Sequence, residues 1–411
     1  DVISRVIYAG KKNGQRELRD LVLTSINTMI ERACEKASRK INTEPAQNGS
    51  SPQSCSAEDI VKAAIVGNSI MIHLLLGIPA ESIRQSPFIT AINNVPVFNA
   101  REVGLDIYKQ APVICLPGVA SYVGADITAG VLSSGLEKME DVTLFMDIGT
   151  NGEIVLGDRD WLVTCACSAG PAFEGAGVND GMRATRGAIE EVWIDNHTYE
   201  PTLRIIGEGK PRGICGSGLI SLIAEMFLTG VVDKGGFLNS DLPTDRIRRE
   251  EYGWEYVVAW ADETWHGKDI AITRVDIDNL IRAKAAIYAG INVLADSVGV
   301  PLEAVKTVLI GGSFGKFINI EKAVQIGLLP DMPWESFHFL GNTAVLGAYH
   351  ALLNQDARKL IDDIAGRMTY IELSADNTFY EAFTSALFLP HTESSRFPSV
   401  AQLLNNPEEN A

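Results

Sequence analysis

The sequence lacks an apolar run that could cross a bilayer, and it lacks a secretion signal. No stretch reaches the eighteen or more apolar residues of a membrane-spanning helix. The first twenty residues are mixed and charged, without the apolar core segment of a signal peptide. We therefore expect no membrane contact and a cytoplasmic location.

Positive charge is also scarce. The chain has 35 Lys and Arg against 52 Asp and Glu, which gives a formal charge of −17. Nucleic acid is bound by cations that neutralise phosphates, so this balance argues against a nucleic-acid partner. The acidity favours solubility, and an electropositive protein partner is the alternative interpretation.

Metal-binding spacings are missing as well. The six cysteines include no C-x₂-C pair, which argues against an iron–sulfur cluster held within this chain. Without a secretion signal we expect reduced thiols, and we interpret the close pair Cys165 and Cys167 as small core side chains. The six histidines show no metal-site spacing, and His73 is interpreted as a satisfied helix residue.

What the sequence does contain is an alternation of short apolar runs with helical stretches, which is typical of an α/β fold. The tail from Ser394 to Ala411 is polar, and we expect it to be frayed. The predicted strands are Ala63–Val66, Val113–Leu116, Thr143–Asp147, Glu153–Leu156 and Thr307–Ile310. The predicted helices include Leu18–Ser38, Ile70–Leu76, Ser217–Leu228, Ile277–Val298 and Ala344–Leu353.

An internal repeat organises these elements. Residues 61–69 match residues 305–313 in residue type at nearly every position, and each copy is an apolar strand that runs into a glycine turn. Further along, residues 117–125 and 340–348 each open a helix after a glycine. The order predicts a duplicated α/β domain, with chance similarity of glycine turns as the alternative.

The repeat is incomplete in its first half. The second half begins with a strand–turn–strand segment, residues 144–156, that has no counterpart before residue 61. If the halves are homologous, the matching hairpin is expected just upstream of Asp1. We therefore predict a truncated first domain over 1–142, a second domain over 143–350 and a C-terminal extension over 351–411.

The first candidate site is the turn Asp147-Ile-Gly-Thr-Asn-Gly-Glu153, which lies between two strands and lacks the Gly-Lys-Ser/Thr of a P-loop. Gly149 and Gly152 allow backbone N–H groups to approach phosphate, and Thr150 and Asn151 offer further donors. Asp147, at the strand end, is placed to hold Mg²⁺ through water. A plain β-hairpin turn is the alternative, because Asn-Gly favours such turns by itself.

Two further glycine segments are candidates for nucleotide contacts. The turn Gly311-Gly312-Ser313-Phe314-Gly315-Lys316 follows an apolar strand and could let a ribose or a flat ring approach the backbone. The segment Gly216-Ser217-Gly218 opens a helix, with Ser217 as the expected N-cap and a positive dipole end available to phosphate. Each signal is weak alone, and their order strengthens both.

These segments resemble the acetate-sugar kinase, Hsp70 and actin superfamily. More narrowly, the span from Asp1 to about His391 resembles the C-terminal part of the reductive activators of corrinoid proteins. The segments that carry the resemblance are residues 66–78, 147–157, 169–176, 213–220, 283–291, 311–317 and 326–330.

The resemblance implies a fold of duplicated RNase H-like (actin-like ATPase) domains that close over ATP. It implies an ATPase that drives the uphill reduction of Co(II) corrinoid to Co(I) on a corrinoid protein. Electrons would come through an iron–sulfur cluster, of the 2Fe–2S or another type, in a part of the full-length protein that this chain lacks. A first phosphate loop would also lie upstream, so this chain by itself could be impaired. We also expect a homodimer.

The resemblance also assigns residues. Asp147, Gly149, Thr150 and Asn151 would form the second phosphate loop, and Asp126 would orient water or metal, with a helix-surface carboxylate as its alternative. The adenosine side would be lined by Gly311, Gly312, Ser313 and Gly315. Ser313 and Lys316 depart from the alanine and asparagine expected in relatives, which puts nucleotide affinity in doubt. Contact of Lys316 with a phosphate is the alternative.

Three other functions stay open. A metabolite kinase of the same superfamily would need a substrate pocket and a base, for which no motif is found. An activator of radical-type dehydratases would need a cluster-binding cysteine such as Cys215, but no second suitable cysteine follows it. A purely structural dimerisation module is the third. The tryptophans Trp254, Trp260 and Trp265 form either a local mini-core or a docking patch.

Overall fold

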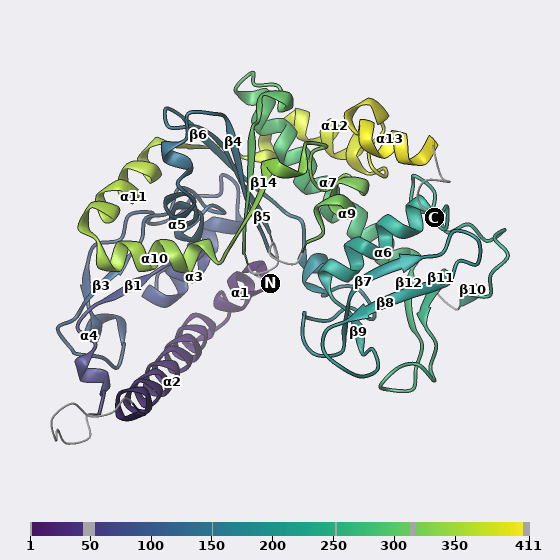
Figure 1. The fold of residues 1–411 in the computed structure, drawn as a ribbon. Helices are drawn as coiled ribbons and strands as arrows, with labels where there is room; N and C mark the ends of the chain where they lie inside the picture. Colours follow the sequence, from purple (N-terminus) through teal and green to yellow (C-terminus); the bar gives the residue numbers. More distant parts are fainter. Residues whose placement is uncertain (1, 44–53, 150, 251–252, 313–317, 406–411) are drawn as a thin grey trace. The chain divides into compact units, whose positions relative to one another are not determined.

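The computed structural model describes residues 2–43, 54–149, 151–250, 253–312 and 318–405 (Figure 1). Contacts divide the chain into two units. The first unit comprises Asp1–Glu137 and Thr343–Tyr370, and the second comprises Lys138–Asn342 and Ile371–Ala411. No helix among the described residues is both long enough and apolar enough to cross a membrane.

The first unit contains a small sheet in the order β1-β3-β2. Strand β1 (Ala63–Ile65) runs parallel to β3 (Pro112–Cys115), and β2 (Phe98–Asn99) is antiparallel to β3. The unit also holds the short strand β15 (Met368–Tyr370). Its helices are α1 (Val2–Ala9), α2 (Gly14–Thr43), α3 (Ser69–Leu76), α4 (Ala100–Val103), α5 (Ala125–Ser134), α10 (Thr343–Leu353) and α11 (Gln355–Arg367).

Helices α5 and α10 of this unit pack closely, because their contact is made of small residues. A Cβ added at Gly347 would lie 2.2 Å from the carbonyl oxygen of Ala129, so only glycine permits this approach. Ala129 and Ala351 are fully buried beside it. The predicted satisfied state of His73 in α3 is confirmed, since its ring contacts the Ser69 carbonyl at 2.7 Å and the Ala91 N–H at 3.1 Å.

The second unit is built on five strands in the order β14-β13-β4-β5-β6. Strands β4, β5 and β6 form an antiparallel meander, whereas β13 is parallel to β4 and β14 is parallel to β13. This is the RNase H-like strand order. The bounds are β4 (Thr143–Ile148), β5 (Gly152–Gly157), β6 (Leu162–Cys167), β13 (Thr307–Gly311) and β14 (Phe337–Gly341).

Helix α7 (Arg274–Ser297) lies against β5 and β6 (Figure 1). Thr273 caps it, with its hydroxyl accepting from the Asp276 N–H at 3.2 Å. A Cβ at Gly290 would lie 2.2 Å from the Cys167 sulfur, so glycine makes room for the buried thiols of β6. The prediction of Cys165 and Cys167 as core thiols is confirmed.

Between β6 and α7 the second unit carries two further three-stranded sheets and helix α6. The first sheet has the order β8-β7-β9, with β7 (Ala188–Ile194), β8 (Pro201–Ile205) and β9 (Gly213–Ile214). The second has the order β10-β11-β12, with β10 (Ile247–Glu250), β11 (Gly253–Ala259) and β12 (Ile270–Thr273). The helices that complete the unit are α6 (Gly216–Leu228), α9 (Ile320–Gln325), α12 (Asn377–Ala386) and α13 (Pro398–Asn405).

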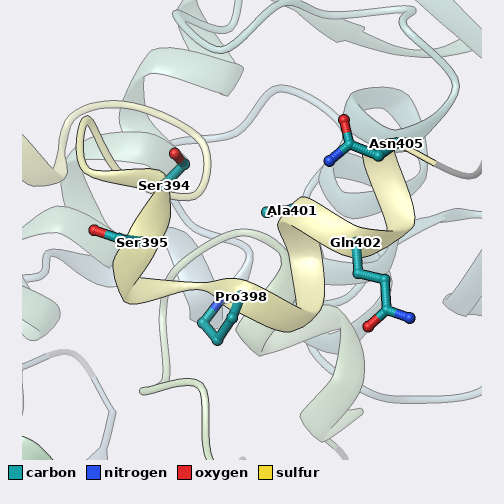
Figure 2. Close-up of a pocket in the computed structure, with 6 residues that line it drawn as sticks. All are labelled: Ser394, Ser395, Pro398, Ala401, Gln402 and Asn405. Atoms are coloured by element: carbon teal, nitrogen blue, oxygen red, sulfur yellow. The ribbon is translucent and has the colours of Figure 1, made fainter.

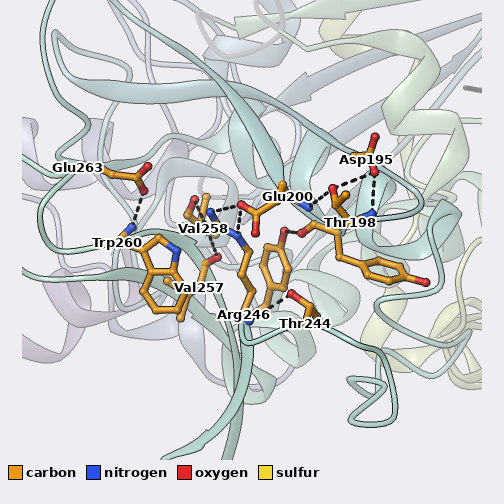
Figure 3. A network of polar contacts seen from close by, with 11 residues as sticks. Asp195, Thr198, Glu200, Thr244, Arg246, Val257, Val258, Trp260 and Glu263 are labelled. Carbon is orange, nitrogen blue, oxygen red and sulfur yellow. Dashed lines mark hydrogen bonds and ion pairs between the residues drawn. The ribbon is translucent and has the colours of Figure 1, made fainter.

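A polar network surrounds Arg246, which directly precedes β10 (Figure 3). Its guanidinium donates to Glu200 at 2.8 Å and to the Val257 carbonyl at 2.9 Å, and it lies 5.3 Å from the ring centre of Trp260. The three tryptophans do not share a core. Trp254 and Trp265 are exposed, with relative accessibilities of 38% and 65%.

The internal repeat has a structural counterpart. In each half a strand pairs in parallel with a second strand, β1 with β3 and β13 with β14, and a helix follows the second strand. Among the described residues before β1 there are helices but no strand hairpin like β4–β5. The hairpin expected upstream of Asp1 stays a prediction.

The division into units differs from the three parts predicted from the sequence. Helix α10, placed at the end of the 143–350 domain, packs on α5 and belongs to the first unit. The segment 351–411 is shared, because α11 joins the first unit and residues 371–405 join the second. The expectation of a frayed tail is wrong over the described residues, since Pro398–Asn405 form helix α13 and both Phe397 and Val400 are fully buried.

Candidate functional site

The strand ends of β4 and β13 meet at the candidate phosphate turn. Asp147 is the fifth residue of β4, and it lies opposite Gly311, the last residue of β13. The next residue, Gly312, has a φ of +85°, which glycine adopts without strain. A Cβ there would lie 2.7 Å from an Asp147 carboxylate oxygen, so the second strand end passes close beside this carboxylate.

Burial dominates the electrostatics of Asp147. It raises the pKa of this carboxyl group to about 6, because the ionised form loses solvation. Glu153, itself buried, is its partner across the β4–β5 ladder. A carboxylate that is costly to ionise alone is one that gains from a bound cation.

The turn after β4 leaves space for a ligand at Gly149. The Gly149 N–H donates to the Asn151 carbonyl at 2.9 Å, which closes the turn. Of the atoms in the described part of the chain, the nearest to a Cβ added at Gly149 is a carboxylate oxygen of Glu174, at 3.6 Å. Gly152 serves packing instead, because its Cβ would lie 2.9 Å from the Ile287 side chain on α7. Thr150 lies outside the described residues.

Glu174 is a candidate site residue that the sequence did not predict. It ends the short 3₁₀ turn η4 (Pro171–Glu174), it is exposed, and its carboxylate reaches toward the Gly149 turn. From the sequence, the segment from Ala169 to Ala176 carries only a family resemblance and no predicted contact with the nucleotide. The signal available in the sequence was a glutamate between two glycines, which is typical of a tight turn that presents a side chain. In the structure Gly170 and Gly175 both have positive φ.

The start of helix α6 is built differently from the prediction. Ser217 is not the N-cap; Cys215 occupies that position, since the helix begins at Gly216. The Ser217 hydroxyl contacts the Cys215 sulfur at 3.3 Å, and Gly218 packs on β7, where a Cβ would lie 2.2 Å from the Ile189 carbonyl oxygen. Gly216, Ser217 and Gly218 are all buried, and these contacts of the turn are with other protein atoms.

Helix α6 nevertheless supports the site through η4. Phe173 is buried and lines a small internal cavity with Leu219 and Ile220 of α6 and Lys284 of α7. Glu174 follows Phe173 directly. The helix start predicted to bind phosphate is therefore connected to the turn through packing.

The remaining predicted residues fall elsewhere. Asp126 lies in the first turn of α5, in the first unit. Ser313, Phe314, Gly315 and Lys316 lie outside the described residues, so their assignment to the adenosine side stays a prediction.

The residues present fit a magnesium nucleotide. Mg²⁺ is usually held by one or two carboxylates together with phosphate oxygens and waters. Asp147 supplies such a carboxylate beside a glycine turn that has room for phosphate oxygens. No group of three or more His, Cys, Asp or Glu residues that could hold a metal by itself occurs in the described part of the chain. A metal here would therefore depend on the nucleotide.

A hollow on the surface of the second unit lies at α13 and contains none of these residues (Figure 2). It measures about 530 Å³ and is lined by Ser394, Ser395, Pro398, Ala401, Gln402 and Asn405. None of these six described lining residues carries a charge that would bind phosphate or metal.

The RNase H-like strand order and the glycine-lined strand ends define a protein of the actin-like ATPase class, the ASKHA superfamily. Residues 141–401 match the family described as "C-terminal domain of RACo the ASKHA domain", and residues 1–139 match "RACo middle region". The chain belongs to this family of RACo-type proteins.

Two relatives of known function and one solved structure support the assignment. The chain is 33% identical over 391 residues to "Corrinoid activation enzyme RamQ" of Eubacterium limosum, covering 93% of the chain and 63% of that protein. It is 25% identical over 351 residues to "[Co(II) methylated amine-specific corrinoid protein] reductase" of Methanosarcina barkeri, covering 78% and 61%.

Among solved structures, "Reductive activator for corrinoid,iron-sulfur protein" matches with a TM-score of 0.86 and 45% identity, covering 97% of this chain and 61% of that chain. The chain therefore spans about three fifths of the length of these relatives. The names of these three relatives describe activation or reduction of corrinoid proteins, and none of the three describes a kinase.

Proposed function

We propose that this chain is the ATP-binding portion of a reductive activator, which couples ATP hydrolysis to the reduction of Co(II) to Co(I) on a corrinoid protein. The observation that carries the proposal is the meeting of the β4 and β13 ends at Asp147 and Gly312, in a chain of the RACo family.

In this proposal Asp147 holds Mg²⁺ and the Gly149 turn receives phosphate oxygens. The metal would neutralise phosphate charge when bound. The Asp147 carboxylate would bind the metal, and Gly312 would keep that carboxylate in place by passing within contact distance. The electrons are expected from an iron–sulfur cluster in a part of the protein outside this chain, and the electron acceptor is the corrinoid. A homodimer and a cytoplasmic location are part of the same proposal.

The test is a spectroscopic assay of cobalt oxidation state. Full-length protein, a corrinoid protein in the Co(II) state and a strong reductant are mixed with and without Mg²⁺-ATP, and Co(I) is followed by its absorption. We expect Co(I) to accumulate only with ATP. Equal reduction without ATP would refute the coupling. Phosphorylation of a small metabolite instead would establish the kinase function.

A further inference from the structure

We propose that Glu174 is the residue that orients the water for attack on the terminal phosphate of ATP. The inference rests on the proposed nucleotide site and assigns a role to a residue outside the predicted phosphate and adenosine segments.

The position of Glu174 is the first support. Its carboxylate oxygen lies 3.6 Å from the point where a Gly149 Cβ would be, so it faces the turn that receives phosphate oxygens. Among the described residues, no other side chain lies within 4 Å of that point. Because the residue is exposed, solvent water reaches this carboxylate.

The second support is that the backbone on either side of Glu174 is held in place, which fixes where its side chain starts. Phe173, which precedes it, is buried with a relative accessibility of 1%. Gly175, which follows it, has a φ of +77°, and a Cβ there would lie 2.5 Å from the Met182 nitrogen. The Gly175 N–H donates to the Ala172 carbonyl at 3.0 Å, and the Ala176 N–H donates to the Pro171 carbonyl at 3.1 Å. Precise placement is what a water-orienting residue requires.

The negative charge of Glu174 favours a role in hydrolysis over a role in binding ATP. A carboxylate beside a phosphate site repels the phosphates, so it would weaken binding if it touched them directly. If a water molecule donates a hydrogen bond to the carboxylate, the negative charge orients that water and increases the nucleophilicity of its oxygen. Asp147 is less suited to orient this water, because its carboxylate is more buried and lies beside the end of β13.

The chemical step balances as a hydrolysis. The water oxygen forms a bond to the terminal phosphorus, and the bond from that phosphorus to the bridging oxygen breaks. The electron pair of the broken bond stays on ADP. The proton of the water passes to Glu174 and then to solvent, leaving inorganic phosphate.

The test compares Glu174→Gln with Glu335→Gln in the full-length protein. Glu335 is a matched control, because it is an exposed glutamate on another 3₁₀ turn of the same unit, η6 (Trp334–Ser336). We expect Glu174→Gln to lower kcat for ATP hydrolysis about 100-fold or more, the usual contribution of a positioned base. Its affinity for a fluorescent ATP analogue with Mg²⁺ should stay within about 3-fold of wild type or rise slightly. Glu174→Asp should recover part of the rate, and Glu335→Gln should change neither quantity.

Each outcome decides the proposal. Unchanged hydrolysis in Glu174→Gln would overturn it, as would a loss of affinity as large as the loss of rate, which would indicate a binding or structural role. Absence of any ATPase activity in the wild-type protein would overturn it too. Cobalt reduction is measured separately, so a wild-type protein that hydrolyses ATP without reducing corrinoid would refute the proposed function and leave the role of Glu174 intact.

Discussion

At the scale of single residues, the buried carboxyl of Asp147 predicts an unusual pH dependence. Its folded-state pKa of about 6 lies above the ordinary value of 3.8, so the folded protein binds a proton more tightly than the unfolded chain. The free energy of unfolding therefore falls as pH rises from about 4 to about 6, because ionising this carboxyl costs more in the folded protein than in the unfolded chain.

Replacing this carboxyl should remove that cost. Asp147→Asn is expected to raise the free energy of unfolding at neutral pH by roughly 2–3 kcal/mol and to change it little below about pH 4. Urea unfolding of wild type and Asp147→Asn between about pH 4 and neutral pH measures this difference in the free energy of unfolding. Asp141→Asn, at an exposed position just before β4, is the control and should be neutral throughout. The same Asn variant should lose Mg²⁺-ATP affinity, and retention of affinity would show that the metal lies elsewhere.

A second prediction at this scale concerns the space at Gly149. Its φ lies outside the left-handed region, and a Cβ would meet its nearest neighbour at 3.6 Å, which is ordinary contact. Gly149→Ala should therefore fold normally and still fill the space we assign to phosphate oxygens. We expect thermal stability close to wild type and at least about tenfold weaker binding of Mg²⁺-ATP.

Gly366→Ala provides the matched comparison for Gly149→Ala. Gly366 lies within α11, and no atom of the described residues is within 4 Å of its Cβ position, so alanine there should stabilise the helix by about 0.5–1 kcal/mol without affecting nucleotide. Undiminished binding in Gly149→Ala would mean that phosphate does not approach this turn.

At the scale of elements, a buried ion pair connects three parts of the second unit. Lys322 of α9 donates to Glu225 of α6, and both side chains are about one tenth exposed. The other Glu225 oxygen accepts from the Ile194 N–H of β7 at 2.8 Å. Removing the lysine leaves a buried carboxylate without its counter-charge.

We expect Lys322→Met to lower the free energy of unfolding by about 3 kcal/mol or more. The double variant Lys322→Met with Glu225→Gln should recover much of this, because the amide keeps an acceptor for the Ile194 N–H and carries no charge. Arg159→Met, which breaks the exposed pair with Glu140, should cost at most about 1 kcal/mol. Equal losses in the two single variants would show that burial does not strengthen the effect of the Lys322 pair. Denaturant unfolding gives all three values.

The elements also show how far the sequence predicts this structure. Strands β4 and β13 and helices α3, α6 and α10 were predicted to within about a residue, because long apolar runs end in glycine or a capping residue there. The α13 tail was misjudged, since Phe397 and Val400 are isolated apolar residues in a polar segment and give no period. Glu174 was missed because its approach to Gly149 depends on tertiary packing, and Ser217 was misplaced because α6 begins one residue earlier.

At the scale of the whole molecule, hydrogen exchange can show which segments of each unit are protected when the nucleotide binds. Hydrogen exchange reports local opening of backbone N–H groups, and a ligand that binds the folded state slows it where the ligand adds stability. We expect Mg²⁺-ATP to slow exchange in the second unit at the β4–β5 turn, at residues 170–177 around η4 and at the end of β13. Helix α4 of the first unit should be unaffected.

The same footprint tests the role predicted for Asp126. If this carboxylate orients water or metal at the nucleotide, the first turn of α5 should also be slowed. Asp126→Asn should then weaken hydrolysis, although the residue belongs to the other unit. Protection confined to the second unit, with full activity in Asp126→Asn, would make Asp126 a helix-surface carboxylate. In that case Glu174 would remain the only carboxylate proposed to orient the water, and the Glu174→Gln variant should account for the whole loss of rate.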